Sequence, residues 1–430
     1  MNFLIQHSQV LDPKAGIDGI TDVVLSKDMA MLASSPRGNE RKIDGRGLLL
    51  VPGFVDLHVH CREPGFEYKE TIASAINAAL AGGVTAFVAM PNTKPVLDNA
   101  AAIKDQFRRA KGLTLDFMAV GCATEGLLGE RVTDIAALKQ AGACAISDDG
   151  RPVSDDGIMR EVLLRCKEHD IVFMQHAEDL GLSCCGAINE GDISRYHCIK
   201  GQSPDAEGVM VERDIELVRQ TGARYHVLHV STARTLAAVR GAKLEGLPVT
   251  CEVSPHHLLL SDLLLQKLDT NKKMNPPLRS IVDQKALWQG LVDGTVDAVA
   301  SDHAPHSAME KAKSIESAPF GVVGLETLFS ALQSFVHQGL ISQDRAIRLL
   351  TSGPATIIGR PYLGTFLAPN SRPNCCLVDL NLDWQVTPEE LHSRSKNSAF
   401  LGMGFRGKVL ATFFEGELAF AHPSFFKRMN

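Results

Sequence analysis

The residues able to do chemistry in this chain of 430 residues stand at the ends of short apolar runs. These residues are His58 and His60, Asn92, Asp148 and Asp149, His176, His229 and Asp302. In a strand, residues two apart face the same side, so His58 and His60 can bind one cation together. Alone, each residue has a plainer interpretation: the histidines as hydrogen-bonded core residues, and Asp302 as a helix cap.

The joint occurrence of these residues favours a metal centre. Four histidines and two carboxylates at matching strand ends suit a borderline-soft divalent ion, most often zinc, and are enough for two ions. A two-metal site with a shared carboxylate lowers the pKa of a water molecule and polarises a carbonyl group. The residues alone therefore predict metal-assisted hydrolysis of an amide, an ester or a phosphate.

The elements that must position these residues are eight apolar runs, each followed by a segment with apolar residues at helical spacing. The runs begin at Val51, Thr85, Asp116, Ala143, Ile171, Arg224, Val249 and Val296. Eight alternations predict an α/β fold, a TIM-like (β/α)8 barrel over residues 51–364, completed by a helical pair between Gly324 and about Ile358. An open doubly wound sheet fits the same period, but the polar residues at the ends of six of the eight runs favour the barrel.

Both ends of the chain differ from this middle. Residues 1–50 and 365–430 hold short alternating stretches separated by Gly, Pro and Asp. Such stretches are typical of strands and turns. We expect the two ends to form one small composite β-sandwich domain beside the barrel.

Composition narrows the class of protein further. The net charge is −6 and no stretch is rich in Lys or Arg, so a nucleic-acid partner is not expected. No apolar run approaches about 18 residues, so we expect no membrane insertion. The ten cysteines include no CxxC pair, and the first residues do not resemble a signal peptide. We therefore expect reduced thiols and a cytoplasmic location.

Several motifs resemble the amidohydrolase superfamily, and more narrowly the bacterial type I dihydroorotases. They are PGFVDLHVHCREPG, MPNTKP, SPHHLLLS, KMNPPLR, SDHAPH and APFGVVGLET, and the resemblance runs from Val51 to about Gly359. It implies a hydrolase of cyclic amides. The implied reaction is the reversible zinc-dependent cyclisation of N-carbamoyl-L-aspartate to (S)-dihydroorotate with release of water, the third step of de novo pyrimidine biosynthesis.

The resemblance also implies a role for each candidate ligand. It implies one Zn²⁺ on His58 and His60, a second on His176 and His229, and a bridge formed by Asp149 and a hydroxide. Asp302 would bind the first zinc and act as general base and acid. Many relatives bridge their metals with a carboxylated lysine, but the fourth run ends in SDDG and offers none. Asp148 remains an alternative to Asp149.

Substrate contacts implied by the resemblance come from separate segments. Arg62 and Asn92, with help from Asn275 and His306, would hold the substrate carboxylate, since a guanidinium group suits a carboxylate. His60, Phe320 and Gly321 are expected to contact the substrate as well. The loop 304–320 fits a solvated connection and a substrate-covering lid equally well.

Two alternative functions compete with this interpretation. Another cyclic amidohydrolase, such as a hydantoinase, dihydropyrimidinase or allantoinase, shares the barrel, but Arg62, Asn92 and Asp149 count against it. A non-catalytic dihydroorotase-like scaffold for aspartate transcarbamoylase would have lost metal ligands, and all are present here. An active chain could still associate with aspartate transcarbamoylase or form a homodimer, and the sequence leaves both open.

Overall fold

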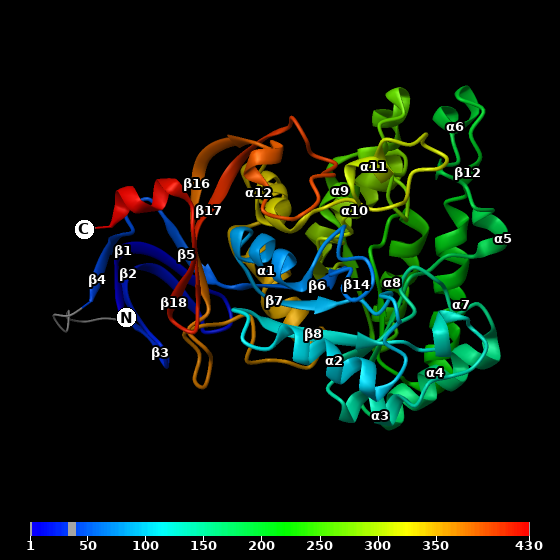
Figure 1. Ribbon diagram of the computed structural model, residues 1–430, viewed down its shortest axis with the longest axis horizontal. Helices are drawn as coiled ribbons and strands as arrows, with labels where there is room; N and C mark the ends of the chain where they lie inside the picture. Colours follow the sequence, from blue (N-terminus) through cyan, green and yellow to red (C-terminus); the bar gives the residue numbers. More distant parts are fainter. Residues whose placement is uncertain (1, 33–39, 430) are drawn as a thin grey trace.

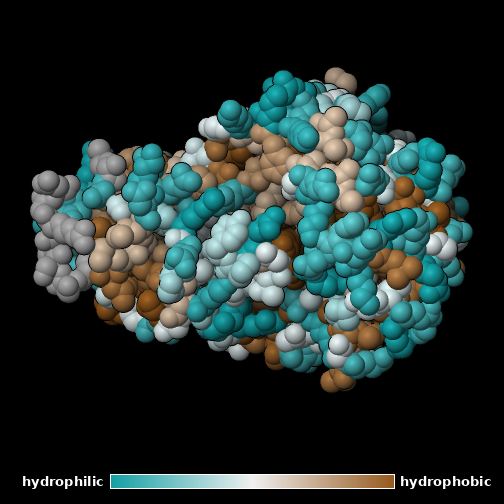
Figure 2. Space-filling view, turned by 90° about the horizontal axis from the view of Figure 1, so that it is seen from below, coloured by the Kyte–Doolittle hydropathy of each residue, from teal (hydrophilic) through white to brown (hydrophobic). Residues whose placement is uncertain are grey.

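A barrel of parallel strands and a mixed sheet built from both chain ends make up the molecule (Figure 1). The computed structural model describes residues 2–32 and 40–429. The part of the expected first domain at residues 33–39 lies outside the described residues. Seen from below, the mixed sheet forms the smaller lobe at the left of an elongated molecule (Figure 2).

The barrel contains eight strands in sequential order, as the sequence predicted. They are β6 (Phe54–Val59), β7 (Val84–Ala89), β8 (Asp116–Gly121), β9 (Ala145–Ile146), β10 (Val172–Gln175), β13 (Tyr225–Val227), β14 (Val249–Val253) and β15 (Ala298–Val299). A parallel bridge between Val59 and His303 closes the ring, supported by a hydrogen bond of 2.8 Å from the His60 amide to the His303 carbonyl. Closure aligns all eight carboxyl ends at one mouth. The α/β barrel expectation is confirmed.

Helices cover the outside of the barrel. They are α1 (Ile72–Ala81), α2 (Ala100–Ala110), α3 (Ile135–Gln140), α4 (Asp156–Glu168), α5 (Leu180–Ser183), α6 (Asp192–Tyr196), α7 (Asp205–Thr221), α8 (Ala233–Leu244), α9 (Pro255–Leu259), α10 (Ile281–Asp293), α11 (Ala308–Lys311), α12 (Leu328–His337), α13 (Gln343–Leu350) and α14 (Ser352–Ile357). Polar side chains fix several starts, since Thr71, Asn99 and Asp155 each accept a backbone N–H three residues on. Where a helical pair was expected after the eighth strand, three α-helices occur, because Thr351 leaves helical geometry between α13 and α14.

Short elements fill the connections between these helices and strands. They are β11 (Ile188–Asn189), β12 (Gly201–Gln202), η1 (Glu125–Leu127), η2 (Asp262–Lys267), η3 (Thr270–Lys272), η4 (Leu325–Thr327), η5 (Pro388–Glu390) and η6 (Pro423–Arg428), the last six being 3₁₀ helices. Among the described residues, no α-helix is both long and apolar enough to cross a bilayer.

The mixed sheet joins the two chain ends in the order β18-β17-β16-β5-β1-β2-β3, with β4 beside β1. Its strands are β1 (Phe3–Asp12), β2 (Ile17–Ser26), β3 (Met29–Leu32), β4 (Arg41–Asp44), β5 (Leu49–Pro52), β16 (Cys375–Gln385), β17 (Gly404–Phe414) and β18 (Glu417–Ala421). The sheet encloses a core of its own, in which Ile5 and Leu25 lie with Leu377 and Phe413.

The apolar run that begins at Val51 belongs to two strands, because β5 ends at Pro52 and β6 begins at Phe54. Gly53 occupies the junction, where a Cβ atom would lie 2.1 Å from the Thr85 hydroxyl oxygen. Only glycine allows this close approach. The division into domains at residues 50 and 365 stays a prediction.

Candidate metal centre

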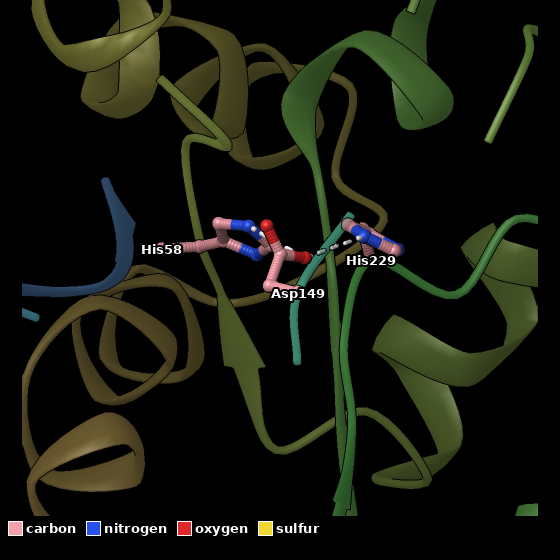
Figure 3. Close-up of side chains that lie close together, drawn as sticks. All are labelled: His58, Asp149 and His229. Carbon is pink, nitrogen blue, oxygen red and sulfur yellow. Dashed lines mark ion pairs between the residues drawn. The ribbon is translucent and has the colours of Figure 1, made fainter. Parts of the chain in front are cut away.

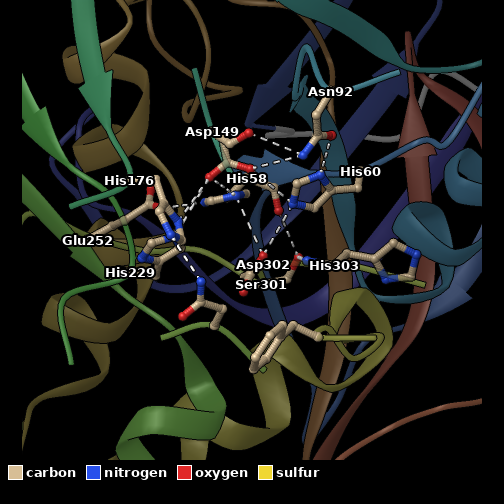
Figure 4. A network of polar contacts seen from close by, with 12 residues as sticks. His58, His60, Asn92, Asp149, His176, His229, Glu252, Ser301, Asp302 and His303 are labelled. Carbon is tan, nitrogen blue, oxygen red and sulfur yellow. Dashed lines mark hydrogen bonds and ion pairs between the residues drawn. The ribbon is translucent and has the colours of Figure 1, made fainter. Parts of the chain in front are cut away.

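All six predicted metal ligands lie together at the carboxyl ends of the barrel strands (Figure 4). His58 belongs to β6, and the other five follow the ends of β6, β9, β10, β13 and β15; they are His60, Asp149, His176, His229 and Asp302. Each side chain is buried, with at most 6% of its residue surface exposed. Segments far apart in the sequence therefore meet at one buried point.

Asp149 lies between His58 and His229 (Figure 3). Its Oδ1 atom is 3.4 Å from His58 Nε2 and 3.7 Å from both His176 Nδ1 and His229 Nε2. Its Oδ2 atom is 3.4 Å from His60 Nε2. The carboxylate thus faces all four histidines, as a shared ligand must.

Asp148, the alternative bridging residue, is turned away from the histidines. Its Oδ1 atom accepts the backbone N–H groups of Ala123 and Thr124 at 2.7 and 3.1 Å, and its Oδ2 atom accepts the Thr124 hydroxyl. Burial raises the pKa of Asp148 to about 6. Both oxygens are occupied by neighbouring backbone and hydroxyl donors, so the geometry favours Asp149 over Asp148.

Asp302, like Asp149, lies close to His58 and His60. Its Oδ1 atom lies 3.5 Å from His58 Nε2 and 3.5 Å from His60 Nε2. Burial by itself would raise the pKa of Asp302, but His58, His60 and His229 together lower it below its ordinary value. Burial likewise opposes the ionised form of Asp149, and the surrounding imidazoles outweigh it and lower that pKa as well.

Most separations between these atoms fit a metal better than they fit hydrogen bonds; the exception is His176 Nδ1, which lies 3.0 Å from His229 Nε2. Zinc bonds of about 2.1 Å in a tetrahedron separate the ligand atoms by about 3.4 Å. Distances of 3.4–3.7 Å lie at or beyond the upper limit for hydrogen bonds. His58 Nε2 and Asp149 Oδ1 are buried without a hydrogen-bond partner among the described residues. Two groups could each hold an ion: His58, Asp149 and His229, and His58, His60 and Asp302.

A second layer of polar groups orients the histidine rings. Glu252 Oε1 lies 3.1 Å from His58 Nδ1, and Asn92 Oδ1 lies 2.9 Å from His60 Nδ1. Because a proton on each Nδ1 would be held by these oxygens, each Nε2 lone pair points at the centre. The opposite arrangement holds at His176, where Nε2 contacts Glu178 at 3.1 Å and leaves Nδ1 for the centre.

Glu252 and Glu178 were not predicted from the sequence. Glu252 is fully buried and also contacts His226 Nε2 at 3.2 Å. The feature of the sequence that could have revealed Glu252 is a single carboxylate inside the otherwise uncharged strand VTCEV, where an unpaired charge would be costly. Glu178 follows His176 by two residues and accepts the Asn275 amide at 2.8 Å. That spacing alone would not have identified it.

The predicted substrate residues line one cavity together with five of the six predicted metal ligands. Its volume is about 200 Å³, smaller than typical drug-binding pockets of about 300–1,000 Å³, so it suits a small molecule. The lining residues are His60, Arg62, Asn92, Asp149, Gly150, His176, His229, Asn275, Asp302, Ala304, His306, Phe320 and Gly321. Every residue assigned to the substrate by resemblance therefore reaches this space.

Contacts within the cavity wall hold Arg62 and His306 in place. Arg62 Nε donates to the Pro305 carbonyl at 3.2 Å, and its Nη2 lies 3.3 Å from His306 Nε2. The same imidazole nitrogen donates to the Phe320 carbonyl at 2.7 Å, while Nδ1 accepts from Lys69 Nζ at 3.2 Å. Burial, with Arg62 and Lys69 nearby, lowers the pKa of His306 and keeps its ring neutral.

Three of the twelve non-glycine residues that have a positive φ in the described part of the chain lie at this site. Arg62, His229 and Asp302 adopt φ angles of 60°, 32° and 47°, in the left-handed region that L-residues seldom occupy. Residues held this way persist only where the surrounding structure imposes the conformation, most often at functional sites.

The barrel with its buried His/Asp cluster at the strand ends defines a metal-dependent amidohydrolase. Residues 47–235 match the family model described as dihydro-orotase-like. The chain is 44% identical over 421 residues to a dihydroorotase from Anaeromyxobacter sp. (strain K), with 96% of each chain covered. It is 40% identical over 430 residues to a dihydroorotase from Solibacter usitatus (strain Ellin6076), with 99% of each covered. This chain belongs to the dihydroorotase family.

Solved structures show the same architecture. The L-hydantoinase (dihydropyrimidinase) from Arthrobacter aurescens superposes with a TM-score of 0.85 at 25% identity, covering 97% of this chain and 95% of that one. The dihydropyrimidinase from Brevibacillus agri NCHU1002 gives 0.85 at 24% identity, with 98% and 95% covered. The likeness confirms the expected fold. Together with the dihydroorotase relatives, the L-hydantoinase confirms the class of cyclic-amide hydrolase.

Proposed function

We propose that this chain is a dihydroorotase, which interconverts N-carbamoyl-L-aspartate and (S)-dihydroorotate in pyrimidine biosynthesis. The observation that carries the proposal is the position of Arg62, which lines the same small cavity as the ligand cluster. A carboxylate on the substrate requires such a cation, whereas hydantoin and dihydrouracil carry no carboxylate. The full-length identity of 40–44% to dihydroorotases supports the same choice.

The six buried ligands would hold two zinc ions per chain. His58, His60 and Asp302 suit one ion, His176 and His229 suit the other, and Asp149 faces both pairs. When bound, the metals supply Lewis acidity toward the substrate carbonyl and lower the pKa of water. Glu252, Asn92 and Glu178 keep the imidazole lone pairs aimed at them.

Proton transfer is the role of Asp302. Its pKa is held below the ordinary value, so it is ionised and able to accept a proton from the attacking water. It then returns the proton to the ring nitrogen that leaves, serving as base and then as acid. Arg62, Asn92, Asn275 and His306 orient the substrate within the same cavity, with His60, Phe320 and Gly321 beside them.

An assay of metal-loaded protein on four cyclic amides tests this function. Loss of the dihydroorotate ring absorbance should be seen, with no turnover of hydantoin, dihydrouracil or allantoin. Arg62→Ala should lower kcat/KM for dihydroorotate about 10- to 150-fold, because a charged contact is worth about 1.5–3 kcal/mol. Arg131→Ala, in which an exposed guanidinium is removed, is the control. Turnover of hydantoin instead would overturn the assignment.

Metal content tests the ligand assignment separately from activity. Wild-type protein should hold about two zinc ions per chain, and His60→Ala should retain about one because His60 lies beside only one group. Asp149→Asn should lose both, since its carboxylate faces all four histidines. Equal zinc content in these two variants would contradict the shared role of Asp149.

Partners and location are further parts of the proposal. Size-exclusion chromatography with light scattering, with and without aspartate transcarbamoylase, distinguishes a monomer from a homodimer and detects a mixed complex. A cytosolic location is supported by the cysteines, since all ten are free thiols and seven of them are buried.

A further inference from the structure

Two segments form part of the wall of the cavity that the candidate metal ligands line. The loop 304–321, which follows β15, carries His306, Phe320 and Gly321. The segment 270–276 carries Asn275. The relative position of these two segments therefore sets the shape of the substrate space.

Lys311, within the loop, reaches across to the other segment. Its Nζ atom donates to the carbonyl oxygens of Thr270 at 2.9 Å and Lys273 at 3.1 Å, and to Pro319 in its own loop at 3.0 Å. The residue is 5% exposed. All three donors of the ammonium group are thus used by backbone oxygens.

Lys273 makes the reciprocal contact from the segment to the loop. Its Nζ atom donates to the carbonyls of Glu316 at 3.1 Å and Ala318 at 2.6 Å, and lies 4.3 Å from the centre of the Phe320 ring. The ring is attracted to the cation through its π face. We call these two residues the crossed lysine clamp, because each segment gives one lysine to the carbonyls of the other.

Burying the two ammonium groups of the clamp costs desolvation free energy. Packing alone does not explain why lysines occupy these positions. Both ammonium groups are buried against carbonyl oxygens and an aromatic ring, and burial lowers the pKa of Lys311 to about 7 and that of Lys273 to about 8. An apolar side chain would avoid this desolvation. What the lysines add is attachment at five carbonyl oxygens, which no apolar residue can supply.

The loop 304–321 borders a second cavity, which is a reason for the loop to be attached to its neighbours. A second cavity, of about 510 Å³, borders the loop at Ser307, Ala308, Lys311 and Ala312. The ends of the loop are tied by Asn397, which accepts the His306 N–H at 3.1 Å and donates to the Gly321 carbonyl at 3.1 Å. Between those ends, Tyr68 and Lys69 hold Glu310 at 3.1 and 2.9 Å. The Thr270 hydroxyl and the clamp lysines join the loop to the segment 270–276.

We propose that Lys273 and Lys311 are positioning residues that fix the loop 304–321 against the segment 270–276, as a permanent wall of the substrate cavity. The loop is then a held element, not a lid that opens at each turnover. The consequence for substrate binding rests on the proposed function, whereas the consequence for loop motion does not.

Hydrogen–deuterium exchange on zinc-loaded protein without substrate tests the clamp directly. Lys311→Met should raise exchange in the loop 304–321 about tenfold or more, with zinc content unchanged. Lys313→Met is the matched control, because Lys313 lies two residues on and is exposed. Unchanged exchange in Lys311→Met overturns the proposal.

Kinetics on the cyclic amide that the wild type hydrolyses gives the second readout. KM should rise about tenfold with kcat changed by less than about threefold, since the wall orients substrate and does not touch the reacting bond. Lys273→Met should show the same pattern. If Lys311→Met does not fold, Lys311→Arg, which keeps the charge, takes its place in the test. A fall in kcat with unchanged KM overturns the proposal. Absence of dihydroorotate turnover in the wild type would refute the proposed function and leave the exchange test standing.

Discussion

At the scale of single residues, Glu252 lies outside the candidate metal ligands, and we expect it to affect their affinity for metal. Its two carboxylate oxygens contact His58 Nδ1 and His226 Nε2. Burial opposes its charge, but the two histidines lower its pKa to about 2, so it is ionised. Glu252→Gln should weaken zinc binding about 10- to 100-fold, as loss of such partners does elsewhere. Competition with a chelator measures this.

The control for Glu252 is Glu168→Gln, which changes an exposed carboxylate on α4. If zinc affinity is equal in the two variants, the carboxylate does not orient His58. Thermal unfolding in the presence of a chelator separates a loss of affinity from a loss of folded protein.

Most of the single residues of the candidate site could be predicted from the sequence, but one choice between neighbours could not. His58, His60, His176, His229 and Asp302 could be placed because each ends an apolar run, and strand ends of a barrel meet at one mouth. The choice between Asp148 and Asp149 could not be made from the run, because both follow β9 directly. It depends on Thr124 and the Ala123 backbone, which capture Asp148 from a different segment.

At the scale of elements, Glu70 ties the start of α1 to the segment 393–395. It accepts the Arg394 N–H at 3.1 Å and the Ser393 hydroxyl, and lies 3.3 Å from His303 Nε2. Burial opposes its charge, but His303, Ser393 and Ser74 lower its pKa below the ordinary 4.5. Its contribution to stability is therefore complete above pH 4.5 and is lost as the pH falls through the lowered pKa.

Glu70→Gln should accordingly lower the free energy of unfolding by about 1–3 kcal/mol at pH 7, because buried donors lose a charged acceptor. The difference from the wild type should shrink below pH 4.5. Urea unfolding at pH 7 and at pH 4 measures both values, with Glu130→Gln, an exposed carboxylate, for comparison. A difference that grows at pH 4 would contradict the linkage.

Elements were predictable where the hydrophobic pattern was long enough. Seven of the eight barrel strands fall within the expected runs, and β7 begins one residue before its run. Two of the strands, β9 and β15, span only two residues each. The division between β5 and β6 was not predicted, since Val51 to Val59 reads as one apolar run and only the close approach of Thr85 to Gly53 separates its parts. The region from α5 to β12 carries no long period, and its short elements could not be derived.

At the scale of the whole molecule, contacts between the mixed sheet and the barrel join the two parts. The Ser330 hydroxyl of α12 donates to the Gly407 carbonyl of β17 at 2.6 Å, and the Thr412 hydroxyl donates to the Leu80 carbonyl of α1 at 2.6 Å. Buried contacts of this kind couple the unfolding of both parts. We therefore expect one unfolding transition.

Gly407 is the position at which this coupling can be perturbed. Its φ is +101°, and a Cβ atom would lie 3.0 Å from Gln333 Cγ of α12. Gly407→Ala should lower the free energy of unfolding by about 1–3 kcal/mol through backbone strain and crowding. Gly404→Ala is the matched control, since Gly404 lies on the same strand and a Cβ there would meet only the Trp384 carbonyl, at 3.9 Å.

The two tryptophans of the chain allow each part to be followed separately. Trp288 lies in α10 of the barrel and Trp384 lies in β16 of the mixed sheet. Trp384→Phe and Trp288→Phe each leave one reporter, and fluorescence during urea unfolding then follows one part at a time. If the parts are coupled, Gly407→Ala lowers the midpoint equally in both backgrounds. A shift confined to the Trp384 signal would mean that the mixed sheet unfolds alone and that the barrel stands without it.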